Sequence, residues 1–253
     1  AAVNLNDGFK KRFYIENINL DNFAYPIERD ELVKSFGPPN YSSFKDIEKE
    51  NILIIGNSFG QDLFYSLKIN ENLFVDYEFS FIRTEIYCLK NFLVTHQFCD
   101  KKLENHEIDK ISKADTVLIS TRWKEKDLEF ISDIVINLKN HNKKIVLVSP
   151  APEFDIYWKY AGSKVYGVVT MLDEYHIKYK KIPNENDKLM LEQGYYSFNL
   201  KDKKYQKNFS FLKTIAEKND IKFLDQKLFY CDDNSETCDI ITDNEEKIFY
   251  DYG

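Results

Sequence analysis

The sequence lacks an apolar run long enough to cross a membrane, and its first residues lack the features of a signal peptide. A membrane-spanning helix needs about 20 consecutive apolar residues. Residues 1–8 have neither a basic stretch nor an apolar one after it. We therefore expect a soluble domain, with any membrane part outside it. The chain begins and ends abruptly, so we interpret it as a segment of a longer protein.

The chain also lacks an excess of positive charge. The 253 residues include 35 Lys and Arg against 42 Asp and Glu, which gives a formal net charge of −7. Proteins that wrap a polyanion usually carry an excess of basic residues, so nucleic acid is not an expected partner. Aromatic residues, in contrast, are plentiful. The 17 Tyr and 20 Phe can supply much of the core of one α/β domain.

Only four cysteines occur, and none has the spacing of a zinc or thioredoxin-like motif. They form two local pairs, Cys88 with Cys99 and Cys231 with Cys238, and no histidine lies at ligand spacing to both. A metal site is therefore not expected. Four unrelated buried thiols are one interpretation, because free cysteine is often buried. Two short-loop disulfides are the other, and they would place the domain in an oxidising compartment.

Short apolar runs alternate with helical patterns along most of the chain. The Ile-rich run at 51–56 is typical of a strand that is buried on both faces of a parallel sheet. Further strands are expected at 74–82, 116–120, 144–149 and 221–224, and helices at 61–68, 108–114, 128–138 and 204–218. This alternation predicts an α/β fold of the flavodoxin-like kind, a three-layer α/β/α sandwich with a parallel sheet of about five strands.

Two segments do not fit the alternation. Residues 1–50 show turn chemistry and little periodicity, so we expect an N-terminal extension packed on a domain of 51–253. Residues 155–203 are rich in Tyr and Lys and do not form one crossover helix, so we interpret them as an insertion with some helix. Its aromatic residues could stack on sugar rings, although such residues are more often part of a core; they include Tyr157, Trp158 and Tyr160.

A serine follows the first predicted strand, where open α/β sheets bind ligands. Ligands lie beyond the carboxyl ends of such strands, and the turn 56–60 (Gly-Asn-Ser-Phe-Gly) lies at such an end and opens a helix. Backbone N–H groups and the helix dipole could stabilise an oxyanion beside Ser58. The alternative is that Ser58 only caps the helix. Nucleotide binding is not supported, because the glycine-rich phosphate motifs are absent.

A serine nucleophile needs a base, which is usually a histidine oriented by a carboxylate. None of the histidines stands next to an obvious acid after a sheet strand, and each is more typical of a surface residue. They are His96, His106, His141 and His176. The residues alone therefore do not identify the base.

Several blocks of the sequence resemble the SGNH (GDSL-like) superfamily. Residues 52–59 resemble its first block, normally Gly-Asp-Ser after a buried strand, with Asn57 in place of Asp. Over nearly its whole length the chain is similar to the C-terminal SGNH domain of integral-membrane acyltransferases that modify bacterial surface glycans. Residues 8–13, 116–123 and 146–154 resemble successive blocks of those domains.

The resemblance implies roles for particular residues. Ser58 would be the nucleophile, and Asp251 would be the acid of a final Asp-x-x-His block whose His is expected just after Gly253. The superfamily's Gly and Asn oxyanion donors have no clear counterparts. The candidates for oxyanion or substrate binding are therefore Asn57, Arg122 and Trp123.

The resemblance also bears on the cysteines. Cys231 and Cys238 look like the paired cysteines before the family's final block, and Cys88 falls where those domains have a cysteine after the second strand. It therefore favours two disulfides, Cys88–Cys99 and Cys231–Cys238.

The implied function is O-acyl transfer through an acyl-serine, with acetyl as the expected group and a bacterial cell-surface polysaccharide, such as lipopolysaccharide, as the acceptor. Expected partners are the acyl donor, the glycan and a membrane acyltransferase domain in the same parent chain. The domain would be tethered at the periplasmic or extracellular face of a bacterial membrane. No cofactor or metal is implied. The alternatives are an SGNH-type ester hydrolase and a catalytically inactive glycan-binding module.

Overall fold

The structure is a computed structural model, and it describes residues 43–45, 48–92, 103–150, 155–161, 164–179, 181–201 and 203–240. The chain divides into two compact units. The first, here called the sheet unit, contains the described residues within 29–151 and 204–227. The second, the hairpin unit, contains those within 152–203 and 228–240.

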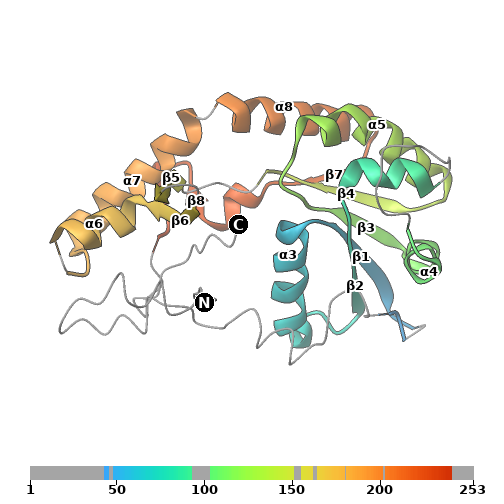
Figure 1. Cartoon of the computed structure of the whole chain (residues 1–253). Coiled ribbons are helices and arrows are strands. Elements are labelled where there is room, and N and C mark those ends of the chain that lie inside the picture. The colour runs from blue at the N-terminus through green and yellow to red at the C-terminus, as the bar shows by residue number, and fades with distance from the viewer. Residues whose placement is uncertain are drawn as a thin grey trace. The chain divides into compact units, whose positions relative to one another are not determined.

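The sheet unit is built on a five-stranded parallel sheet with the order β2-β1-β3-β4-β7 (Figure 1). The strands are β1 (Glu50–Gly56), β2 (Tyr77–Arg83), β3 (Thr116–Ile119), β4 (Lys144–Val148) and β7 (Lys222–Leu224). The strand order reverses between β1 and β3. Doubly wound sheets bind their ligands at such a switch point, beyond the carboxyl ends of the strands.

Helices cover both faces of this sheet (Figure 1). Leu53, Ile54 and Ile55 on β1 are all fully buried, because successive side chains of a strand point to opposite faces and both faces are covered. On one face Ile54 packs with α3 (Ser58–Ile69). Leu53 and Ile55 pack with the helices of the other face, α4 (Asn105–Lys113), α5 (Glu125–Asn140) and α8 (Lys203–Lys218). The predicted three-layer α/β/α fold is confirmed.

The hairpin unit has a small core of its own. It contains an antiparallel pair, β5 (Asp155–Ala161) with β6 (Lys164–Thr170), the helices α6 (Met171–Tyr179) and α7 (Glu185–Lys201), and a short pair, β8 (Cys231–Asp232) with β9 (Thr237–Cys238). Buried residues of α6 and α7 pack with the two cysteines; they include Leu172, Tyr175, Leu191, Tyr195 and Tyr196. Cys231 and Cys238 form a disulfide.

The β5–β6 pair is the clearest difference from the sequence-based expectation. The sequence predicts some helix within 155–203, which α6 and α7 supply, but it does not predict a hairpin before them. Val165, Val168 and Val169 lie on β6, and β-branched residues favour strands. The aromatic residues Tyr157 and Trp158 lie on β5. The proposed boundaries at 51 and 155–203 stay predictions.

Some other expectations concern residues that the structure describes only in part. Cys88 is disulfide-bonded, but its predicted partner, Cys99, lies outside the described residues, as does nearly all of the predicted extension 1–50. Across the segments that the structure describes, no helix is long and apolar enough to span a bilayer.

Lys110 on α4 predicts a pH dependence of stability. It is only 3% exposed, and its Nζ donates to the Phe81 carbonyl at 3.0 Å. Burial lowers its pKa from 10.5 to about 8, against the opposing effect of Glu107. Between these two values the unfolded chain binds more protons than the folded chain, so stability rises with pH across that window.

We expect the free energy of unfolding to rise by on the order of 1 to 3 kcal/mol more in the wild type than in Lys110→Met between pH 8 and 10.5. Urea denaturation at a series of pH values measures this difference. The neutral Met side chain cannot titrate, so the variant serves as the baseline. Parallel profiles for the two proteins would contradict the prediction.

Candidate active site

Asn57 and Ser58 form the turn between β1 and α3. Asn57 is the N-cap of α3, since its Oδ1 accepts a hydrogen bond from the Phe59 N–H at 3.1 Å. Ser58 is the first helical residue and is half-buried. Its hydroxyl has no hydrogen bond to any residue that the structure describes. The cap is therefore Asn57, which leaves the Ser58 hydroxyl available for chemistry.

Two glycines let this turn lie directly against the exit of β3. A Cβ on Gly56 would lie 1.7 Å from the carbonyl oxygen of Ser120, and a Cβ on Gly60 would lie 2.6 Å from the same atom. Real Cβ atoms essentially never come within 3.0 Å of another heavy atom in this way. The glycines at 56 and 60 are therefore set by close packing, and this packing holds Ser58 at the switch point.

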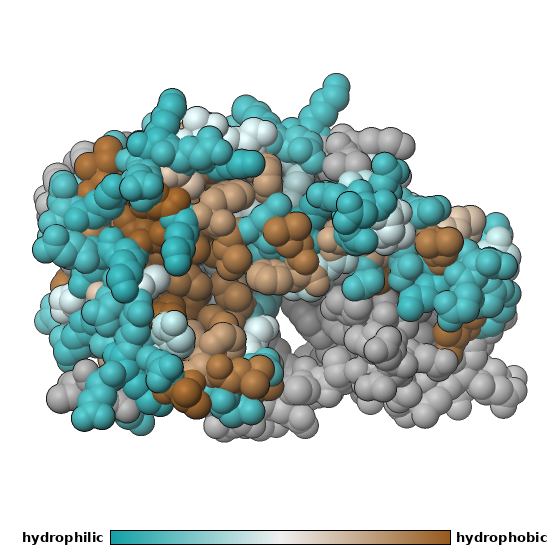
Figure 2. Space-filling view, turned by 180° about the vertical axis from the view of Figure 1, so that it is seen from behind, coloured by the Kyte–Doolittle hydropathy of each residue, from teal (hydrophilic) through white to brown (hydrophobic). Residues whose placement is uncertain are grey.

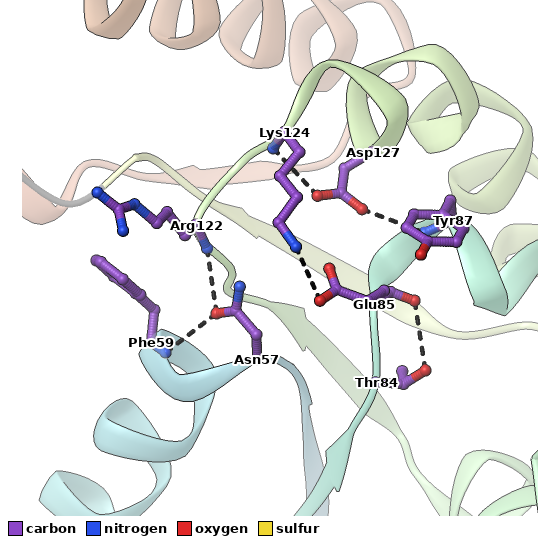
Figure 3. Close-up of polar contacts among 8 residues, drawn as sticks. All are labelled: Asn57, Phe59, Thr84, Glu85, Tyr87, Arg122, Lys124 and Asp127. Atoms are coloured by element: carbon purple, nitrogen blue, oxygen red, sulfur yellow. Dashed lines mark hydrogen bonds and ion pairs between the residues drawn. The ribbon is translucent and has the colours of Figure 1, made fainter. Parts of the chain in front are cut away.

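Backbone hydrogen bonds tie the same turn to two neighbouring strand exits. Thr84, after β2, donates its N–H to the Gly56 carbonyl at 3.0 Å, and Ser120, after β3, donates to the Ile55 carbonyl at 3.0 Å. Arg122 donates its N–H to Asn57 Oδ1 at 3.2 Å (Figure 3). Hydrogen bonds from the exits of β2 and β3 thus hold the end of β1 and the turn that carries Ser58.

The N-terminus of α3 is electrostatically suited to an anion. The first turn of the helix contains no acidic residue, so no side-chain carboxylate neutralises the positive end of the helix dipole. The first N–H groups of a helix have no partner within the helix. Such a turn can stabilise the oxyanion that forms when a serine hydroxyl attacks an ester.

A comparison with protein families shows to which family the chain belongs. The family model described as "SGNH domain (fused to AT3 domains)" matches residues 28–253. The chain belongs to this family. It is therefore a domain of the esterase and acyltransferase type, of a kind found fused to membrane acyltransferase domains. No curated protein matches the chain.

A polar cluster around the buried Asp127 joins the exits of β2 and β3 in this SGNH domain (Figure 3). Lys124 Nζ lies 2.9 Å from Glu85 Oε1. The fully buried Asp127 accepts hydrogen bonds from the backbone N–H of Lys124 at 3.1 Å and from that of Tyr87 at 3.3 Å. Burial raises the pKa of Asp127, and the two N–H groups oppose that rise. Asp127 thereby joins the start of α5 to the 3₁₀ helix η4 (Ile86–Phe92).

Sequence reasoning missed this cluster, although one signal was present. Lys124 and Asp127 have the i, i+3 spacing of a capping box, in which the third helical residue bonds back to the N-cap backbone. The contact of Asp127 with Tyr87 spans 40 residues. No local sequence pattern predicts the contact between Asp127 and Tyr87.

The exits of β4 and β7 carry a second set of polar contacts. Ser149 Oγ accepts the Gln226 N–H at 2.8 Å, and the Gln226 side chain reaches Ser120 Oγ at 3.4 Å. All three residues are buried. Polar contacts therefore join the carboxyl ends of β3, β4 and β7, and these buried residues support the loops of the site.

Arg122 and Trp123, both predicted as ligand-binding candidates, have different environments in the SGNH domain. Arg122 is half-buried, and its side chain extends on the same side as Phe59, away from the Glu85–Lys124 pair (Figure 3). Trp123 is 3% exposed and belongs to the core, where its indole N–H donates to the Val148 carbonyl at 3.0 Å. This placement favours a supporting role for Trp123 over contact with a ligand.

We expect Trp123→Phe to lower the free energy of unfolding by about 1 to 3 kcal/mol, because it leaves the buried Val148 carbonyl without its donor. Ester turnover per folded molecule should change less than about tenfold. Chemical denaturation and steady-state kinetics measure the two effects. An unchanged stability with a raised KM for the acceptor would instead indicate that Trp123 binds substrate.

The histidines that the structure describes do not contact Ser58. His106 Nδ1 lies 3.3 Å from Glu104, and His141 Nδ1 lies 2.9 Å from the Asn137 carbonyl at the end of α5. His96 and Asp251 lie outside the described residues, and the side chain of His176 is not described. The structure therefore identifies no base for Ser58 within its described part, and the same residues contain no group of three or more potential metal ligands.

Proposed function

We propose that this SGNH domain is a serine-dependent O-acyltransferase that moves an acetyl group onto a hydroxyl of a bacterial cell-surface polysaccharide. The observation that carries the proposal is the position of Ser58, at the N-terminus of α3 and at the switch point of the sheet. Its hydroxyl does not cap the helix and has no hydrogen-bond partner among the described residues. Membership of a family fused to AT3 domains supports acyl transfer as the chemistry.

In the proposed mechanism, Ser58 Oγ attacks the carbonyl carbon of the acyl donor while a histidine removes the hydroxyl proton. The Ser58 N–H and the positive end of α3 stabilise the negative oxygen. The intermediate collapses to acyl-Ser58, and the leaving group takes the proton from the histidine. A glycan hydroxyl then attacks acyl-Ser58, the histidine accepts its proton, and Ser58 leaves with that proton.

The histidine is proposed to follow Gly253 directly in the parent chain, with Asp251 orienting it. Asp251-Tyr252-Gly253 supplies the first three positions of the family's Asp-x-x-His pattern. The mechanism uses only a nucleophile, a base and electrostatic stabilisation, so we propose that no cofactor takes part. The acyl group would come from the membrane acyltransferase domain of the same chain, at the periplasmic or extracellular face of the membrane.

The test uses the chain extended past Gly253 to the natural C-terminus, with p-nitrophenyl acetate as donor and purified bacterial polysaccharides as acceptors. Mass spectrometry of the peptide that contains Ser58 detects the acyl-enzyme, and analysis of the glycan detects the product. Acetylated glycan supports the transferase. Acetyl-Ser58 with free acetate as the only product indicates a hydrolase. Glycan binding without acetyl-Ser58 indicates a binding module.

A further inference from the structure

We propose that the side-chain amide of Asn57 has two functions, in which Oδ1 holds the nucleophile turn and the Nδ2 group donates a hydrogen bond to the acyl oxygen that becomes negative as Ser58 attacks. This inference rests on the proposed acyl transfer. It assigns a catalytic donor to the position at which this chain departs from the Gly-Asp-Ser pattern that it resembles.

The orientation of the amide follows from its partners. Asn57 Oδ1 lies 3.1 Å from the Phe59 nitrogen and 3.2 Å from the Arg122 nitrogen, and both partners are backbone N–H donors. An amide NH₂ group cannot accept a hydrogen bond, so a flipped side chain would set its donors against two other donors. The oxygen must therefore face the backbone, and Nδ2 must face the other way.

The Nδ2 group is left available at the site. No residue in the described segments accepts a hydrogen bond from it, and Asn57 is only half-buried. Figure 3 shows Nδ2 on the side of the amide turned away from Phe59. Asn57 directly precedes Ser58 in the chain, so this donor belongs to the turn that carries the nucleophile.

The strand exits explain why such a donor is needed. An oxyanion hole normally uses more than one donor, and each donor contributes about 10²- to 10³-fold to the rate. The N–H groups of Thr84, Ser120 and Arg122 lie at the exits of β2 and β3, but each already donates to the end of β1 or to Asn57. Asn57 Nδ2 is a donor in the same turn, and no residue that the structure describes accepts a hydrogen bond from it.

An aspartate at this position would have different chemistry in the same geometry. Its carboxylate could accept both backbone hydrogen bonds, and its charge would favour the N-terminus of α3. It has no N–H to donate, however, and it would place a negative charge beside the developing oxyanion. Asn57→Asp therefore separates the structural function of the residue from the catalytic one.

The experiment compares Asn57→Asp with the wild type in the chain extended to its natural C-terminus, using the p-nitrophenolate burst to measure acylation of Ser58. We expect the acylation rate to fall about 10²- to 10³-fold, with the melting temperature unchanged or raised. Asn57→Ser is a second variant, because Ser caps helices about as well as Asn, carries no charge and lacks Nδ2. It should lose activity to a similar extent.

Asn184→Asp is the matched control. Asn184 lies just before α7, and its Oδ1 accepts the Asp187 N–H at 3.0 Å, so it has a similar capping contact away from Ser58. Its acylation rate should equal that of the wild type. Acylation within about threefold of the wild type in folded Asn57→Asp, or in Asn57→Ser, would overturn the donor role of Nδ2. If Ser58→Ala also acylates normally, the proposed function itself fails.

Discussion

Replacing Ser58 by alanine should lower kcat/KM for acetyl transfer by about 10⁴-fold or more in the chain that extends past Gly253. The expected loss is this large because no acyl-enzyme can form without the hydroxyl. The melting temperature should hardly change, because the hydroxyl neither caps α3 nor bonds to any described residue. Kinetics with p-nitrophenyl acetate and thermal unfolding measure the two effects.

Ser66→Ala is the matched control for this change. Ser66 lies on the same helix, is exposed, and bonds only to its own helix through the Asp62 carbonyl at 2.9 Å. Substitution of Ser66 by alanine should leave kcat/KM for acetyl transfer unchanged. Equal activity in Ser58→Ala and Ser66→Ala would exclude Ser58 as the nucleophile.

Gly56→Ala should destabilise the sheet unit by more than about 3 kcal/mol, an exceptional cost for a single methyl group. The new Cβ would lie 1.7 Å from the Ser120 carbonyl oxygen, and both groups belong to backbone that is hydrogen-bonded on either side. No side-chain rotation can relieve this contact. The melting temperature should fall by roughly 10 °C or the protein should not fold, as measured by thermal unfolding followed by circular dichroism.

Two further glycines serve as comparisons, because an added Cβ would meet less severe contacts at both. Gly60→Ala should cost less than Gly56→Ala, since its Cβ would lie 2.6 Å from the same oxygen. Gly194→Ala on α7 should be neutral or stabilising by up to about 1 kcal/mol, because the nearest atom is the flexible Met171 Sδ at 3.1 Å. A folded Gly56→Ala protein with a wild-type melting temperature would contradict the close contact between Gly56 and the Ser120 carbonyl.

The parts of the fold that the sequence predicts correctly are those with a local signal. The Ile-rich run of β1 and the apolar spacing of α5 are visible within a few residues, and each predicted element is found within a few residues of its expected limits. The β5–β6 pair gave no comparable signal, because the segment is rich in Tyr and Lys and has no clear alternation. The pair is nevertheless local, because Ala161 pairs with Lys164. The two residues between them are Gly-Ser, a hairpin signal that the sequence-based prediction did not use.

The site shows the same division. The serine after β1 is evident from the strand–turn–helix pattern, but the contact between Asn57 and Arg122 joins residues 65 positions apart. The buried indole of Trp123 donates to the carbonyl of Val148, which lies 25 residues away. Sequence reasoning could therefore name the residues near the nucleophile, whereas the separation of supporting from exposed groups required the fold.

Arg122 has a consequence for how this family can diverge. It supports the nucleophile turn through its main-chain N–H, and every amino acid except proline supplies that group. A mutation at position 122 to any residue but proline therefore keeps this donor to Asn57 while it changes the size and charge of a side chain near the nucleophile turn. The side chain at position 122 is thus open to evolutionary change, whereas selection should remove proline, which would take away the N–H that holds Asn57.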